Sequence, residues 1–220
     1  MADVSTRSQN KSARRTRILV EAADLMASGG MQGLTLRELA AASDVTVPTI
    51  YNLIGGRDQI IMELVNDAMD QMDAVLARQP ETSGIEYGLA AIESCFDLAL
   101  SQKTLYRAVF GALFEMEASA VADWMGALFR RGGAVMHVAV LKSIEDRDLR
   151  GDLAALPMAH NAFHAFQATL RMWAVGALDT RNSKARARYA YLMSLLADAT
   201  PKGRRKIRAL MADAERTLDR

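Results

Sequence analysis

The sequence predicts an all-α protein built from a three-helix head and a larger helical bundle behind it. Apolar residues recur at helical spacing along nearly the whole chain, and no segment shows the convincing alternation of a β-strand. Half of the 220 residues are apolar, which is enough for a sizeable core. Because Gly55-Gly56 separates two different patterns, we expect a head domain at residues 1–56 and a bundle domain at residues 57–220.

The first helix is predicted from apolar residues at positions 18, 22, 25 and 26, which fall on one helical face. Residues 1–10 are polar, and we expect them to be frayed. Gly29-Gly30 is typical of the left-handed cap that ends a helix, so we expect the first helix to stop there.

Two short helices are predicted next, each opened by a threonine. Thr35 precedes Leu36 and is followed three residues later by Glu38, which is the spacing of a capping box. Thr46 opens the second helix, and Pro48 is tolerated in its first turn. This second helix should end before Gly55-Gly56.

The remainder reads as a series of longer amphipathic helices separated by polar or Gly- and Pro-containing breaks. The helix that begins at Arg57 has a long apolar stripe and is broken at Pro80 to Gly84. We expect the others at Ile85–Leu100, Thr104–Glu115, Ala118–Glu145, Leu153–Leu178, Ser183–Ala199 and Lys202–Leu218.

The segment Leu36–Leu53 fits a helix-turn-helix. Two short helices that cross steeply need small or apolar residues where they meet, and this segment has them at fixed places. The inward-facing residues are Leu39, Ala40, Val45, Ile50 and Leu53. The same spacing also occurs in ordinary helical corners, so the motif alone leaves both interpretations open.

If the motif reads DNA, the second helix enters the major groove with an uncharged face. Thr49 and Asn52 would hydrogen-bond to base edges, and Val47 and Pro48 would contact thymine methyls. Phosphates would be met by the two helix N-termini and by nearby side chains. These phosphate-contacting candidates are Lys11, Arg14, Arg15, Thr35, Arg37, Thr46, Tyr51 and Arg57.

Residues 11–61 resemble the DNA-binding head of the TetR (tetracycline-repressor-like) family of transcription regulators. The resemblance is carried by Gly33-Leu34-Thr35, Arg37-Glu38-Leu39-Ala40 and Asp44-Val45-Thr46-Val47-Pro48-Thr49-Ile50-Tyr51, in order and spacing. The chain departs from the family pattern at Asp44, where glycine is usual and where aspartate tolerates the left-handed conformation better than most residues. Leu53 replaces a polar aromatic residue and cannot donate a hydrogen bond to a phosphate. Arg57 occupies a position where the family usually has lysine, and it keeps the positive charge.

The resemblance implies a homodimer that binds double-stranded operator DNA and is released from it by a small molecule. Dimerisation would use the helices at residues 153–199. Their apolar stripes are Ala159, Ala162, Phe163, Phe166, Leu170 and Trp173 on one helix, and Tyr189, Leu192, Met193 and Leu196 on the other. The stripes could instead pack only within the subunit.

The same resemblance, together with a core rich in methionine and aromatic residues, favours a pocket for a hydrophobic or aromatic effector. The residues expected to line it are Met69, Met72, Phe96, Phe110, Phe114, Trp124, Met136, His137 and His164. Such residues are also common in an ordinary core. The alternative functions are a helical scaffold, or a small enzyme that uses the bundle pocket without binding an operator.

Other functions have little support in the sequence. His160 and His164 are four residues apart, but no carboxylate accompanies them at metal-binding spacing, so we expect no metal, no cofactor and no catalytic activity. One cysteine, Cys95, excludes an intrachain disulfide. We found no secretory signal and no apolar run long enough to cross a membrane, and we expect a cytoplasmic protein.

Overall fold

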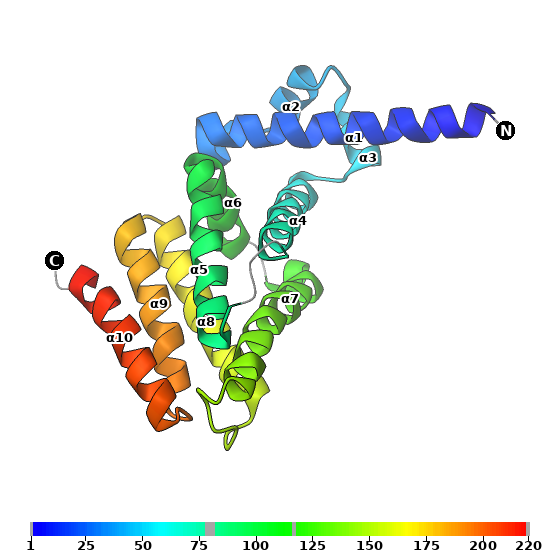
Figure 1. The fold of residues 1–220 in the computed structure, drawn as a ribbon. Coiled ribbons are helices and arrows are strands. Elements are labelled where there is room, and N and C mark those ends of the chain that lie inside the picture. The colour runs from blue at the N-terminus through cyan, green and yellow to red at the C-terminus, as the bar shows by residue number, and fades with distance from the viewer. Residues whose placement is uncertain (1, 78–81, 116–117, 219–220) are drawn as a thin grey trace. The chain divides into compact units, whose positions relative to one another are not determined.

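The computed structural model describes residues 2–77, 82–115 and 118–218. Within these ranges the chain is helical, and the only β-pairing is an isolated bridge between Leu149 and Ala199. The elements, coloured along the chain in Figure 1, are α1 (Ala2–Gly29), the 3-10 turn η1 (Gly30–Gly33), α2 (Leu36–Ala42), α3 (Val47–Leu53), α4 (Arg57–Leu76), α5 (Gly84–Ser101), α6 (Lys103–Glu115), α7 (Ala118–Glu145), α8 (Ala155–Ala174), α9 (Thr180–Leu196) and α10 (Pro201–Leu218).

The chain divides into two compact units. We call the first, Met1–Gln71 with Ala99–Met116, the head unit, and the second, Met72–Leu98 with Glu117–Arg220, the bundle unit. The helix α4 is continuous across the division, so it begins in the head unit and ends in the bundle unit. These compact units are defined by how the residues within each of them pack together. The predicted functional boundary after residue 56 remains a prediction.

The head unit is built on α1, which packs against η1, α2, α3 and α6. Ile18, Ala22 and Met26 of α1 are fully buried, as the helical spacing predicted. The helix also begins earlier than expected: it starts at Ala2, whereas the sequence predicted frayed residues up to position 10. Serine and asparagine are only mildly unfavourable in a helix, so a polar N-terminal segment can continue a helix that is anchored further along.

The core of the bundle unit is aromatic. Consecutive helices α7, α8, α9 and α10 pack pairwise, and α5 contributes Phe96. The Phe96 ring meets the rings of Phe166 and Trp173 edge-to-face, with centroids 6.0 and 6.4 Å apart. Trp173 is fully buried and its indole N–H donates to the Thr180 hydroxyl at 3.0 Å, so its one polar group is satisfied.

The connection between α8 and α9 lies earlier in the chain than the sequence predicted. The helix α8 ends at Ala174 rather than at residue 178, because Gly176 adopts a left-handed conformation with φ of 79°. Asp179 then caps α9 by accepting the Asn182 N–H at 2.8 Å, so α9 begins at Thr180 rather than at Ser183.

The charge cluster at residues 146–152 forms an anchored loop. The carboxylate of Asp198, which is fully buried, accepts the backbone N–H groups of Gly151 and Asp152 at 2.8 and 3.2 Å. Asp148 is also buried and pairs with Lys202 at 3.0 Å. The loop is thereby fixed against the start of α10. In the described part of the chain, no helix is long and apolar enough to cross a membrane.

Candidate nucleic-acid interface and bundle groove

The two short helices of the head unit are capped as the sequence predicted. Thr35 is the N-cap of α2: its hydroxyl oxygen accepts the Glu38 N–H at 3.2 Å and its O–H donates to the Glu38 carboxylate at 2.6 Å. Thr46 caps α3 and accepts the Thr49 N–H at 3.4 Å. Both threonines are exposed, so the N-termini of α2 and α3 face solvent and can meet phosphates.

The turn between α2 and α3 depends on Asp44. Its φ of 53° is left-handed, as expected for a residue that replaces glycine in this turn. The turn closes with a hydrogen bond from the Val45 N–H to the Ala40 carbonyl at 3.0 Å. Leu39, Ala40 and Ile50 are buried where the helices cross, so the predicted inner face is confirmed for these three residues.

The outward face of α3 is exposed and uncharged. Pro48, Tyr51 and Asn52 are exposed, with Tyr51 56% accessible, and Val47 and Thr49 are half-buried. The Thr49 hydroxyl lies 2.9 Å from that of Thr46, so it already has a local hydrogen-bonding partner. Asn52 is therefore the residue of this face best placed to hydrogen-bond to a base edge.

The compact unit that carries this face also carries exposed cations. Lys11 and Arg14 on α1, Arg37 on α2 and Arg57 on α4 are all exposed. Arg15 is half-buried, and its guanidinium forms an ion pair with Glu63 of α4 at 2.7 Å. Arg15 therefore already has an acidic partner within the head unit.

The residues predicted to line an effector pocket are divided between the two compact units. Met69 and Phe110 belong to the head unit, where Phe110 stacks on Tyr106. In the bundle unit, Phe96 and Met136 are buried, His137 is half-buried and His164 is exposed. The side chains of Met72, Phe114 and Trp124 lie outside those the structure describes.

The histidine pair on α8 lies at the surface. His160 and His164 are both exposed, with ring centroids 6.3 Å apart, and His164 meets the edge of Phe129 at 5.6 Å. Among the residues that the structure describes, no group of three or more His, Cys, Asp or Glu side chains could hold a metal ion.

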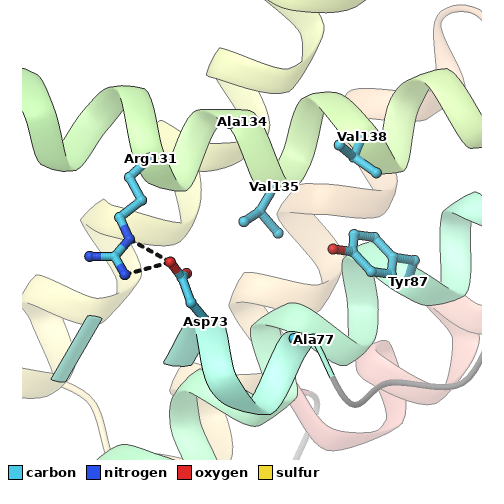
Figure 2. Close-up of a pocket in the computed structure, with 7 residues that line it drawn as sticks. All are labelled: Asp73, Ala77, Tyr87, Arg131, Ala134, Val135 and Val138. Carbon is cyan, nitrogen blue, oxygen red and sulfur yellow. Dashed lines mark hydrogen bonds and ion pairs between the residues drawn. The ribbon is translucent and has the colours of Figure 1, made fainter. Parts of the chain in front are cut away.

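An open groove of about 370 Å³ lies in the bundle unit, and Figure 2 shows its lining. Arg131 and Asp73 form an ion pair at one end, with the Nε to Oδ2 distance 2.6 Å. Tyr87 lies at the other end of the view, and Val135 lies between them. Among the described residues, those that line the groove are Asp73, Ala77, Tyr87, Arg131, Ala134, Val135 and Val138.

None of these groove residues was predicted from the sequence. Positions 131, 134, 135 and 138 have the spacing of one helical face, which is a signal the sequence contains. However, the spacing does not show that this face of α7 lies opposite the end of α4, since that depends on packing between distant segments.

The apolar stripe predicted on α8 for dimerisation is not accessible at the surface of the chain. All six residues of the α8 stripe, from Ala159 to Trp173, are buried within the single chain. Those side chains pack inside the subunit, because they form the bundle core with α5. The large apolar side chains that remain exposed on α8 and α9 are Leu156, Met172 and Met193.

Residues 18–64 match the family model described as bacterial regulatory proteins of the tetR family. The match begins within α1 and ends within α4, so it includes both helices of the helix-turn-helix. A search of curated proteins gave no match for this sequence.

Solved structures of similar fold cover nearly the whole chain. A TetR-family transcriptional regulator from Marinobacter aquaeolei aligns with a TM-score of 0.64 and 18% identity, over 91% of this chain and 98% of that one. SmeT, the repressor of the Stenotrophomonas maltophilia multidrug efflux pump SmeDEF, gives 0.66 and 17%, over 85% and 91%. RolR in complex with resorcinol gives 0.66 and 16%, over 97% and 96%.

Proposed function

We propose that this chain, which belongs to the tetR family of bacterial regulatory proteins, is a cytoplasmic homodimeric repressor that a hydrophobic small molecule releases from its operator. The exposed, uncharged face of α3 carries the proposal, because four exposed cations of the same compact unit accompany it. An outward-facing short helix of this kind is suited to the major groove, where base edges can be distinguished.

The head unit divides the work of DNA recognition between two sets of residues. Lys11, Arg14, Arg37 and Arg57 neutralise phosphates and position α3 without reading sequence. Asn52 offers both a donor and an acceptor, which is the pattern that pairs with adenine in the major groove. Pro48 and Val47 add apolar contact for thymine methyl groups.

Dimerisation follows from the small size of this interface. One recognition helix contacts too few base pairs to select a site in a genome, and a two-fold dimer doubles the number of contacts. Leu156, Met172 and Met193 are exposed apolar side chains on α8 and α9 that a second copy would cover. Met172→Glu should therefore weaken the dimer, as measured by light scattering coupled to size-exclusion chromatography.

Repression and small-molecule binding are each represented among the proteins with the same fold. SmeT is a repressor of a multidrug efflux pump, and RolR has been crystallised with resorcinol. In this chain, α4 runs from the head unit into the bundle unit, so an event at its bundle end can change the position of its head end.

Binding to the intergenic DNA beside the protein's own gene tests the proposal. We expect the wild-type protein to retard this fragment, and Asn52→Asp to abolish binding because a carboxylate on α3 repels the DNA. The control is Ala209→Asp, which adds a carboxylate at an exposed position of α10, away from the proposed dimer helices. Equal binding by wild type and Asn52→Asp would contradict the assignment of α3 to DNA recognition.

Repression is tested by transcription in vitro from the same fragment. The wild-type protein should reduce transcript from the adjoining promoter, and the Asn52→Asp variant should not. An increase in transcript would show that the protein is an activator.

A further inference from the structure

The ion pair in the bundle groove joins two helices that are far apart in sequence. Asp73 lies in the last turn of α4, and Arg131 lies on α7 (Figure 2). Both are in the bundle unit, although α4 starts in the head unit at Arg57. The contact therefore ties the far end of the helix that carries Arg57 to the wall of the groove.

The ion pair lies at an accessible site, where a ligand can replace one of its two partners. The Arg131 side chain is 36% exposed and that of Asp73 is 48% exposed, and ion pairs at such accessible sites contribute little net stability. Asp73 also lies at the C-terminal end of a helix, where the unpaired carbonyl groups disfavour a negative charge. Release of Asp73 into water should therefore be easy.

Next to the pair, the groove offers an apolar strip. Ala134, Val135 and Val138 follow Arg131 along one face of α7 and line the groove with Ala77. Seven residues of helix separate Arg131 from Val138, which corresponds to about 10 Å. A short hydrocarbon chain has the right length and chemistry to cover this strip.

The charges around the groove select the sign of the ligand. Arg131 presents a planar fork that matches a carboxylate, and Lys142 places its amino group 5.8 Å from the centre of the Tyr87 ring. A carboxylate ligand would replace Asp73 and leave Arg131 with an equivalent acceptor. A cationic ligand would instead have to displace Arg131 from Asp73.

From this arrangement we propose that the groove binds an amphipathic organic carboxylate, which takes Arg131 from Asp73 and so releases the end of α4 from α7. This inference rests on the proposed function in its regulatory part only. Because coupling between two sites is reciprocal, operator DNA should weaken ligand binding by the same factor by which the ligand weakens operator binding.

Three probes with the same eight-carbon chain test the sign of the ligand: octanoate, octanol and octylamine. Calorimetry on the full chain should show octanoate binding at least tenfold more tightly than either of the other two. Octylamine or octanol binding as tightly as octanoate would overturn the proposal.

Two variants test the ion pair. Asp73→Asn removes the competing carboxylate and should raise the affinity for octanoate, whereas Arg131→Gln should abolish the preference for octanoate over octanol. The control is Lys184→Gln, which breaks a different ion pair of the bundle unit, with Asp97 at 2.9 Å, and should leave binding unchanged. Undetectable octanoate binding by Asp73→Asn, in a protein with an unaltered circular dichroism spectrum, would overturn the proposal.

A titration of the operator complex with octanoate separates this inference from the proposed function. Octanoate should release DNA from the wild type but not from Arg131→Gln. Octanoate binding that leaves the operator complex intact would overturn the regulatory part. Absence of operator binding under all conditions would refute the proposed function. The calorimetric result would still show whether the groove binds octanoate.

Discussion

The salt dependence of DNA binding should reveal how many cations of the head unit contact phosphate. Lys11, Arg14, Arg37 and Arg57 are exposed, whereas Arg15 is engaged by Glu63. Each neutralised phosphate contributes about 0.9 to the slope of log affinity against log salt, so a dimer with about four contacts per subunit has a slope of about −7. A rise from about 50 to 200 mM salt should then weaken binding about 10⁴-fold.

Arg14→Gln removes one of these contacts from each subunit and so two from the dimer. The slope should fall to about −5.4, and the loss of affinity over the same salt range should fall to about 2,000-fold. Fluorescence anisotropy with the intergenic fragment and with an unrelated fragment measures both slopes, which should change equally because phosphate contacts do not read sequence.

The control for this measurement is Arg205→Gln, which removes an exposed cation from α10 in the bundle unit. It should leave the slope unchanged. An unchanged slope for Arg14→Gln, or the same reduction for Arg205→Gln, would refute the assignment of phosphate contacts to the head unit.

Three further predictions concern α3, two glycines and the cysteine. Tyr51→Phe should weaken binding to all DNA sequences about equally, whereas Asn52→Ala should change the preference at one base pair. A selection from randomised half-sites would measure both effects. Uniform losses from both variants would exclude Asn52 as a base reader. Gly203→Ala should lower the free energy of unfolding by about 1–3 kcal/mol, because its Cβ would overlap the Asp148 carbonyl oxygen. Gly111→Ala in α6 meets no described atom within 4 Å and should raise the free energy of unfolding by about 0.5–1 kcal/mol, as urea denaturation would measure. Burial raises the pKa of the Cys95 thiol to about 12, so a thiol reagent at pH 8 should label the unfolded chain but not the native one. For the same reason, the contribution of Cys95 to stability should be complete below the unfolded pKa of about 8.5 and should be lost as pH rises toward 12; rapid labelling of the native protein would contradict the buried placement.

The helix-turn-helix could be predicted from the sequence because its determinants are local. Thr35 and Thr46 cap helices that begin one residue later, and Asp44 sets the turn through its own backbone conformation. These interactions span three or four residues, so the order of residues along the chain is sufficient to specify them.

The ends of the bundle helices were less predictable. The apolar pattern of α8 continues to Leu178, but Gly176 ends the helix by its left-handed conformation and Asp179 starts the next one. Two local signals there competed with the periodicity, and the cap and the glycine determined the outcome because they satisfy the backbone groups at the helix ends.

The helix-turn-helix and the periodicity of the long helices were thus determined by sequence alone. Tertiary structure decided which apolar residues form the core and which stay accessible. The stripe that ends at Trp173 has the pattern of an interface, yet it is buried against α5 within the subunit. The groove likewise depends on Asp73 meeting Arg131 across 58 residues of chain. Helical spacing specifies that a face exists, but its partner depends on how distant segments fold together.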